Sequence, residues 1–186
     1  MEVTRVFHPV GQGGFYTECF DDLNNHPMVV YDCGGKSKQI IEQQIDKFLA
    51  SKGSPKIDYL FISHFHRDHI NGVRYLLANA NVEHIVIPQL ENARLIEAYI
   101  YNAITGDNIN DTQDDAQIFI RLQLATHDIP VEQIIEVESF KGERQYLEQH
   151  TNGRNVTIQS GDRIEVSDDN GNPYWTYIPI NIVTEK

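Results

Sequence analysis

The sequence predicts a mixed α/β fold, and three observations support this prediction. Short apolar segments typical of strands alternate with segments whose apolar residues recur at helical spacing. Turn signals built from glycine, proline and asparagine separate these segments. The chain has 186 residues, of which 40% are hydrophobic, so residues 1–186 fit one domain with one buried core. Because strands and helices are interspersed, we expect helices to cover the faces of a sheet.

The N-terminal part of the chain predicts three strands joined by tight turns. The expected strands are residues 3–8, 15–20 and 28–31, with turns at the glycine-rich residues 11–14 and at the Asn-Asn pair 24–25. A phosphate cradle is the alternative for the glycine-rich turn. Its spacing differs from that of a phosphate-binding loop and no helix is expected after it, so we interpret it as a hairpin turn.

The period then changes to that of a helix. Apolar residues recur three or four apart between Ser37, a suitable N-cap, and Gly53, a suitable C-terminal stop. Further on, the polar residues 106–115 predict a loop. We expect later strands at residues 59–62, 85–87, 134–137, 156–159, 164–166 and 174–183, and later helices at residues 73–78, 92–104 and 114–126.

Charge and composition disfavour several classes of function. The 27 Asp and Glu residues outnumber the 15 Lys and Arg residues, and the net charge of −12 disfavours long nucleic acid as a partner. No apolar run approaches the ~20 residues that cross a bilayer, and no secretory signal is visible, so we expect a cytoplasmic protein without membrane association. Cys19 and Cys33 are too few for a disulfide framework and are expected to be buried thiols.

The clearest chemical signal is the segment 63–69, Ser-His-Phe-His-Arg-Asp-His, which directly follows an apolar predicted strand. In an extended backbone His64, His66 and Asp68 point to the same side, and a turn brings His69 beside them. Imidazole and carboxylate groups suit Zn²⁺ and other divalent metals such as Mn²⁺ or Fe²⁺. We therefore predict that these four side chains bind one or two metal ions. Because a metal lowers the pKa of bound water towards ~7, hydrolysis is the expected chemistry, with Asp68 as the catalytic residue that positions or deprotonates the water.

The pattern His-x-His-x-Asp-His after a hydrophobic strand resembles the signature of the metallo-β-lactamase fold superfamily. This resemblance implies an αβ/βα sandwich with a metal site at one sheet edge. It also implies that His64 and His66 bind a first metal and that Asp68 and His69 bind a second. Relatives with a redox di-iron site usually carry Glu at the position of His66, so the resemblance favours zinc hydrolysis over oxygen reduction.

Two further motifs extend the resemblance towards the N-terminus. Val-Gly-Gln-Gly at residues 10–13 and Val-Tyr-Asp-Cys-Gly-Gly at residues 30–35 are similar to the pattern of competence-protein-type domains of this superfamily. In such domains the aspartate at the position of Asp32 supports the metal loop by hydrogen bonding and does not bind metal. A carboxylate at a strand end can orient a ligand imidazole in this way. The alternative is a turn aspartate that accepts backbone N–H bonds.

The resemblance leaves part of the family's metal site without a match. The family takes a third histidine, a bridging aspartate and a last histidine from the second half of its fold, whereas His84, His127 and His150 do not stand in the expected setting after a strand. We therefore expect the chain to hold the N-terminal half to two-thirds of the sandwich, incomplete at its C-terminus. In that case residues 174–183 would form an unpaired strand edge prone to association.

These observations together predict a metal-dependent hydrolase. The resemblance favours a phosphodiester or nucleotide substrate, and the negative charge favours small nucleotides or a short strand over a long polymer. Two alternatives stay open. One is a catalytically incomplete interaction subunit that a partner chain or a second copy completes, and the other is hydrolysis of thioesters or lactones on the same metal scaffold.

Overall fold

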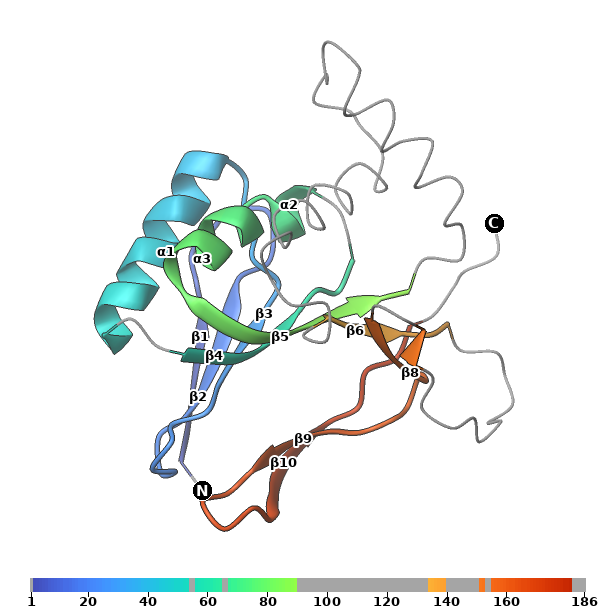
Figure 1. Ribbon diagram of the computed structural model, residues 1–186. Coiled ribbons are helices and arrows are strands. Elements are labelled where there is room, and N and C mark those ends of the chain that lie inside the picture. Colours follow the sequence, from blue (N-terminus) through green and yellow to red (C-terminus); the bar gives the residue numbers. More distant parts are fainter. Residues whose placement is uncertain are drawn as a thin grey trace.

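The structure is a computed structural model that describes residues 2–53, 56–64, 67–89, 134–139, 151–152 and 155–181 (Figure 1). The helices expected at residues 92–104 and 114–126 and the loop expected at residues 106–115 lie outside these ranges. The helices that are described are α1 (Lys38–Lys52), α2 (Arg67–Ile70) and α3 (Val73–Asn79). The strands are β1 (Val3–Phe7), β2 (Tyr16–Phe20), β3 (Met28–Tyr31), β4 (Lys56–Phe61), β5 (Asn81–Pro88), β6 (Ile134–Val137), β7 (Thr151–Asn152), β8 (Asn155–Ile158), β9 (Ile164–Ser167) and β10 (Pro173–Tyr177).

One large sheet organises the molecule, with strand order β1-β2-β3-β4-β5-β6-β8-β7. Strands β1, β2 and β3 form the predicted antiparallel meander. Strands β3, β4, β5, β6 and β8 are parallel neighbours, and β7 is antiparallel to β8. Parallel strands place their carboxyl ends at one edge of a sheet, where sites are commonly built. The predicted mixed α/β class is confirmed.

Helix α1 has the ends that the sequence predicts. The Ser37 side chain accepts a hydrogen bond from the Ile40 N–H at 3.3 Å, which caps the first turn. Gly53 follows with φ of 69°, a left-handed conformation that glycine adopts without steric cost, and its N–H donates to Leu49. Apolar residues between these caps, among them Ile41 and Ile45, are fully buried against the sheet.

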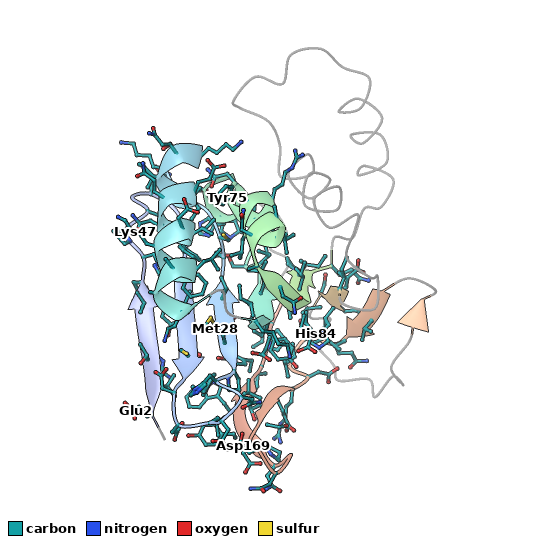
Figure 2. All side chains as sticks on the ribbon, turned by 60° about the vertical axis from the view of Figure 1, so that its left-hand side comes forward. Glu2, Met28, Lys47, Tyr75, His84 and Asp169 are labelled. Atoms are coloured by element: carbon teal, nitrogen blue, oxygen red, sulfur yellow. The ribbon has the colours of Figure 1, made fainter. Side chains whose placement is uncertain are left out.

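The sheet is apolar on both faces because its central strands lie between two cores. On β4, Leu60 belongs to the core under α1 and α3, whereas its neighbour Phe61 belongs to the core on the opposite face. The two helices lie on one side of the sheet in Figure 1, and the β9–β10 hairpin covers part of the other. In Figure 2, Tyr75 accordingly lies in the helical layer and Asp169 in the hairpin.

The β9–β10 hairpin is fastened to the meander by polar contacts. The Tyr177 hydroxyl donates to Glu18, and the Asn24 side chain donates to Asp169 at 2.7 Å. The Arg5 guanidinium lies 5.3 Å from the ring centroid of Trp175. These contacts join residues about 150 positions apart in the chain.

The bounds predicted for the last strand are wrong. The strand expected at residues 174–183 ends at Tyr177, and it pairs with β9 in a two-stranded sheet, so that one of its sides is paired. Pro179 follows shortly after, and proline has no N–H to continue a ladder.

Two central strands are longer than the sequence predicts. β4 begins at Lys56, three residues before the expected segment 59–62, and β5 spans Asn81–Pro88 where only 85–87 was expected. The first residues of both strands include polar side chains, so the apolar pattern did not indicate that the strands begin there. As a result His84 stands within a strand that has neighbours on both sides.

Both cysteines are confirmed as buried free thiols, and Cys33 is fully buried. Across the part of the chain that the structure describes, none of the helices has the length and apolar character needed to cross a membrane.

Candidate metal centre

The candidate site lies where β3 and β4 end at the same edge of the sheet. Asp32 follows β3 directly, and Ser63 and His64 follow β4. The two loops are joined at the backbone, since the Asp32 N–H donates to the Phe61 carbonyl at 2.8 Å. The parallel register, which pairs Tyr31 with Phe61, therefore brings together residues about 30 positions apart in the sequence.

The Asp32 carboxylate is the centre of this arrangement. It is only 7% exposed, and it accepts hydrogen bonds from the Ser63 N–H at 2.8 Å and the Ser63 hydroxyl at 2.7 Å. Its Oδ2 atom also lies 2.7 Å from Nδ1 of His69. Asp32 has φ of 53°, a left-handed conformation that aspartate tolerates better than most residues. The predicted contact between Asp32 and an imidazole is present, and so is the backbone contact of the alternative interpretation.

The same network fixes how the two imidazoles are protonated. The Ser63 hydroxyl has one proton, which it donates to Asp32, so its oxygen can accept from Nδ1–H of His64, 2.8 Å away. Nδ1–H of His69 likewise donates to Asp32. This assignment follows from the hydrogen-bond network, and in the neutral form of either ring it places the lone pair on Nε2, an atom that can bind a metal. The ring centroids of His64 and His69 lie 4.0 Å apart.

Asp68 and His69 reach the site from a helical turn. The extended backbone expected through Asp68 is wrong, because α2 begins at Arg67. The turn is held from distant loops: the Asp68 carbonyl accepts from the Gly14 N–H at 3.1 Å, and the His69 carbonyl accepts from the Cys33 N–H at 2.8 Å. Oδ2 of Asp68 lies 4.0 Å from Nε2 of His69, so the predicted neighbours are adjacent despite the different backbone.

Glycines allow the three loops to approach this closely. A Cβ atom on Gly13 or on Gly34 would lie 2.3 Å from the Asp68 carbonyl oxygen, and one on Gly14 would lie 2.9 Å from Oδ2 of Asp32. Such distances exclude a side chain unless the backbone shifts. The glycine-rich residues 11–14 are therefore a hairpin turn, as predicted, and the turn also packs against the candidate site.

Sequence reasoning missed two supporting residues. Ser63 was quoted in the motif without a role, although its hydroxyl connects His64 to Asp32. Asn71 is the second such residue. Its side chain accepts from the Gly35 N–H at 3.0 Å and donates to the Gly35 carbonyl at 2.8 Å, which ties the loop after β3 to the segment that carries His69. The position of Asn71, directly after the histidine motif, was the available signal.

The comparison with protein families agrees with this geometry. A family model described as the metallo-beta-lactamase superfamily matches residues 24–165, which is more than half of the chain. The chain belongs to the metallo-beta-lactamase superfamily. The match includes Asp32, His64, Asp68 and His69, and it confirms the resemblance inferred from the histidine motif. The competence-protein subtype stays a prediction. A comparison with curated proteins gave no match.

The donor types at the site fit the metals that this superfamily binds. His64 and His69 supply imidazoles and Asp68 a carboxylate, the kinds of ligand that suit Zn²⁺. His66, the fourth predicted ligand, lies outside the described residues. The described residues, these three included, contain no group of three or more His, Cys, Asp or Glu side chains placed to hold a metal ion.

Other candidate ligands are less suited to the site. The thiol of Cys33 has a raised pKa, because of its burial and then the nearby charge of Asp32, so it is protonated at neutral pH and is a poor ligand. His84 lies on β5 with its ring 5.2 Å from that of Tyr59, on a central strand of the sheet. His127 and His150 lie outside the described residues.

Proposed function

We propose that this protein is a metal-dependent hydrolase that cleaves a phosphodiester or a nucleotide. Its membership of the metallo-beta-lactamase superfamily supports metal-dependent hydrolysis in general. The observation that carries the proposal is the network in which one buried carboxylate, Asp32, orients His69 directly and His64 through Ser63. Such hydrogen bonds keep imidazoles in the tautomer and orientation that metal binding needs.

Each residue of the network has a distinct part in this proposal. His64, His66, Asp68 and His69 would hold one or two Zn²⁺ ions, with Mn²⁺ or Fe²⁺ as substitutes. A bound ion of this kind lowers the pKa of coordinated water towards ~7 and so makes a nucleophile available at neutral pH. Asp68 would position the water and accept its proton, while Asp32 and Ser63 hold the imidazoles without touching the reacting atoms.

The net charge of the chain bears on the size of the substrate. A net charge of −12 opposes tight binding of long nucleic acid, so we propose a small nucleotide or a short strand. The cytoplasm is the proposed compartment, because a reducing environment suits two buried free thiols.

The test is hydrolysis of bis(p-nitrophenyl) phosphate by the full chain in the presence of zinc. We expect His69→Ala and His66→Ala to lower the rate by at least about 100-fold, since each removes a ligand. The exposed His26, replaced by asparagine, is the matched control and should keep the wild-type rate. Turnover that survives His69→Ala, or that a chelator does not change, would contradict the proposal.

A panel of thioester and lactone substrates tests the substrate class separately. Zinc-dependent hydrolysis of a thioester or lactone, with no hydrolysis of phosphodiesters, would keep the reaction type and reject the proposed substrate. Absence of all turnover together with concentration-dependent association would instead support the alternative of an interaction subunit.

A further inference from the structure

A row of aromatic side chains crosses four neighbouring strands close to the candidate metal centre. The strand registers pair Phe7 with Tyr16, Tyr16 with Tyr31, and Tyr31 with Phe61, so the four rings stand side by side on one face of the sheet. The rings form two pairs: the centroids of Phe7 and Tyr16 are 4.5 Å apart, and those of Tyr31 and Phe61 are 5.0 Å apart and stacked.

Part of this row lines a pocket of about 470 Å³, a volume within the range of small-molecule sites. Phe7, Tyr16 and Tyr31 form its aromatic walls, and Asp32 and Gly14 also line it. Asp32 is shared between the two places, because it lines the pocket and lies 2.7 Å from Nδ1 of His69. The pocket therefore borders the carboxylate that orients a predicted metal ligand.

The exposure of two of the rings indicates that the row can contact a ligand. Phe7 is 81% exposed on the edge strand β1, and Tyr31 is 36% exposed although it follows three buried residues of β3. Exposed aromatic rings grouped around a pocket mark binding surfaces more often than isolated apolar residues do. The Phe7 ring is largely exposed although it contacts Tyr16, so a second flat ring has room to stack on it.

The polar residues around the pocket are a neutral imidazole, a carboxylate and a lysine at the margin. Burial lowers the pKa of His8, on the pocket wall, to about 4, so its imidazole is neutral at pH 7. Lys36 is exposed beside the pocket, since a Cβ atom on the lining residue Gly11 would lie 3.3 Å from its Cβ. The aromatic rings suit a nucleobase and the Lys36 ammonium suits its phosphate, whereas the Asp32 carboxylate in the same lining opposes a phosphate placed next to it.

We propose that this pocket binds a nucleobase of a nucleotide or short-strand substrate, stacked on the rings of Phe7 and Tyr16. The inference rests on the proposed function, and it adds the group by which the substrate is recognised. Stacking is tolerant of base identity, because every base has a flat π-face. The pocket therefore selects nucleotides over other phosphodiesters without reading a sequence.

The test measures binding by the full chain with zinc removed by a chelator, so that no turnover interferes. The probe is the dinucleotide ApA, and ribose 5-phosphate is the base-free comparison; both are followed by calorimetry. We expect Phe7→Ala to weaken ApA binding about tenfold, since each stacked base contributes substantially to affinity. Val6→Ala is the matched control: Val6 is 39% exposed on the same strand but lies outside the pocket, and its loss should change affinity less than about twofold.

Three results would overturn the inference. They are an unchanged ApA affinity in Phe7→Ala, equally tight binding of ribose 5-phosphate, and a change in oligomeric state on Phe7→Ala that shows this face to be an interface between copies. None of them depends on hydrolysis, because the binding is measured without metal. Loss of turnover with base binding intact would reject the proposed reaction and leave the pocket assignment standing.

Discussion

Replacement of Asp32 by asparagine tests the network on which the site depends. The carboxylate accepts three hydrogen bonds, two on Oδ2 and one on Oδ1, whereas an amide has one acceptor oxygen and one donor nitrogen. If the amide nitrogen takes the place of Oδ2, it donates to His69 Nδ1, and the proton of His69 moves to Nε2. If it takes the place of Oδ1, it faces the Ser63 N–H and neither donor is satisfied.

The expected magnitudes differ for stability and for metal binding. An unsatisfied buried donor costs about 1–3 kcal/mol, and 1 kcal/mol corresponds to about 2–4 °C in a chain of this size, so Tm should fall by about 2–12 °C. Zinc affinity should fall about 10- to 100-fold, as for the loss of other hydrogen bonds that orient ligands. Asparagine also tolerates the left-handed backbone at this position, so backbone strain adds little.

The assay pairs thermal unfolding by circular dichroism with zinc titration against a chromophoric chelator. Asp58→Asn is the matched control, because Asp58 is a strand carboxylate that accepts from the Met28 N–H at 2.7 Å and lies on β4 outside the site. The control should lose stability and keep the zinc affinity of the wild type. A folded Asp32→Asn variant with unchanged zinc affinity would refute the reasoning.

Three other substitutions test the loops and the sheet. Gly34→Ala should lower Tm by about 4–12 °C, because its Cβ would lie 2.3 Å from the Asp68 carbonyl oxygen and overpacking costs about 2–3 kcal/mol. Tyr177→Phe should cost about 1–2 kcal/mol in urea unfolding. Burial raises the pKa of Glu18, but hydrogen bonds from Tyr177 and other donors outweigh burial and lower this pKa overall. The stability of the wild type therefore falls below pH ~4.5, where Glu18 becomes protonated. Tyr177→Phe removes one of these donors, so the variant should lose less stability in this pH range. Burial lowers the pKa of His8 from 6.5 to about 4. As the pH drops from 6.5 to about 4, the unfolded chain therefore binds a proton that the folded chain does not, and stability decreases. In His8→Asn this decrease should be smaller.

Each of these substitutions has a control in the same chain. Gly171→Ala adds a Cβ with nothing within 4 Å and should cost only the strain of its positive φ. Tyr174→Phe removes a hydrogen bond to Asp22 at the surface and should change stability little. His26→Asn removes an exposed imidazole and is the histidine control for His8→Asn. Equal effects in a control and its partner would contradict the corresponding structural reason.

Local sequence signals predicted the elements whose stability is local. Ser37 and Gly53 set the ends of α1 because capping depends on residues within one helical turn. The contact between Asp32 and an imidazole was expected from the family resemblance, and the position of Asp32 at a strand end agrees with it. The strand starts of β4 and β5 could not be placed, because polar residues there are paired by neighbouring strands distant in the sequence.

The parts that could not be predicted depend on contacts between distant segments. The helical turn at Asp68 and His69 is held by N–H groups of Gly14 and Cys33, which lie more than 30 residues away. The role of Ser63 requires Asp32 and His64 to be in place first. The pairing of β10 with β9, and its contact with Glu18 on β2, likewise arise only when the sheet has formed.

Cobalt titration tests most directly whether His64 and His69 bind a metal, since Co²⁺ accepts the same imidazole and carboxylate ligands as Zn²⁺ and reports them by visible absorption. The full chain should develop ligand-field bands that saturate at about one or two Co²⁺ per chain and that zinc abolishes. A variant with both His64 and His69 replaced by alanine, checked to be folded, should lose these bands. Bands of undiminished intensity in that variant would contradict the account.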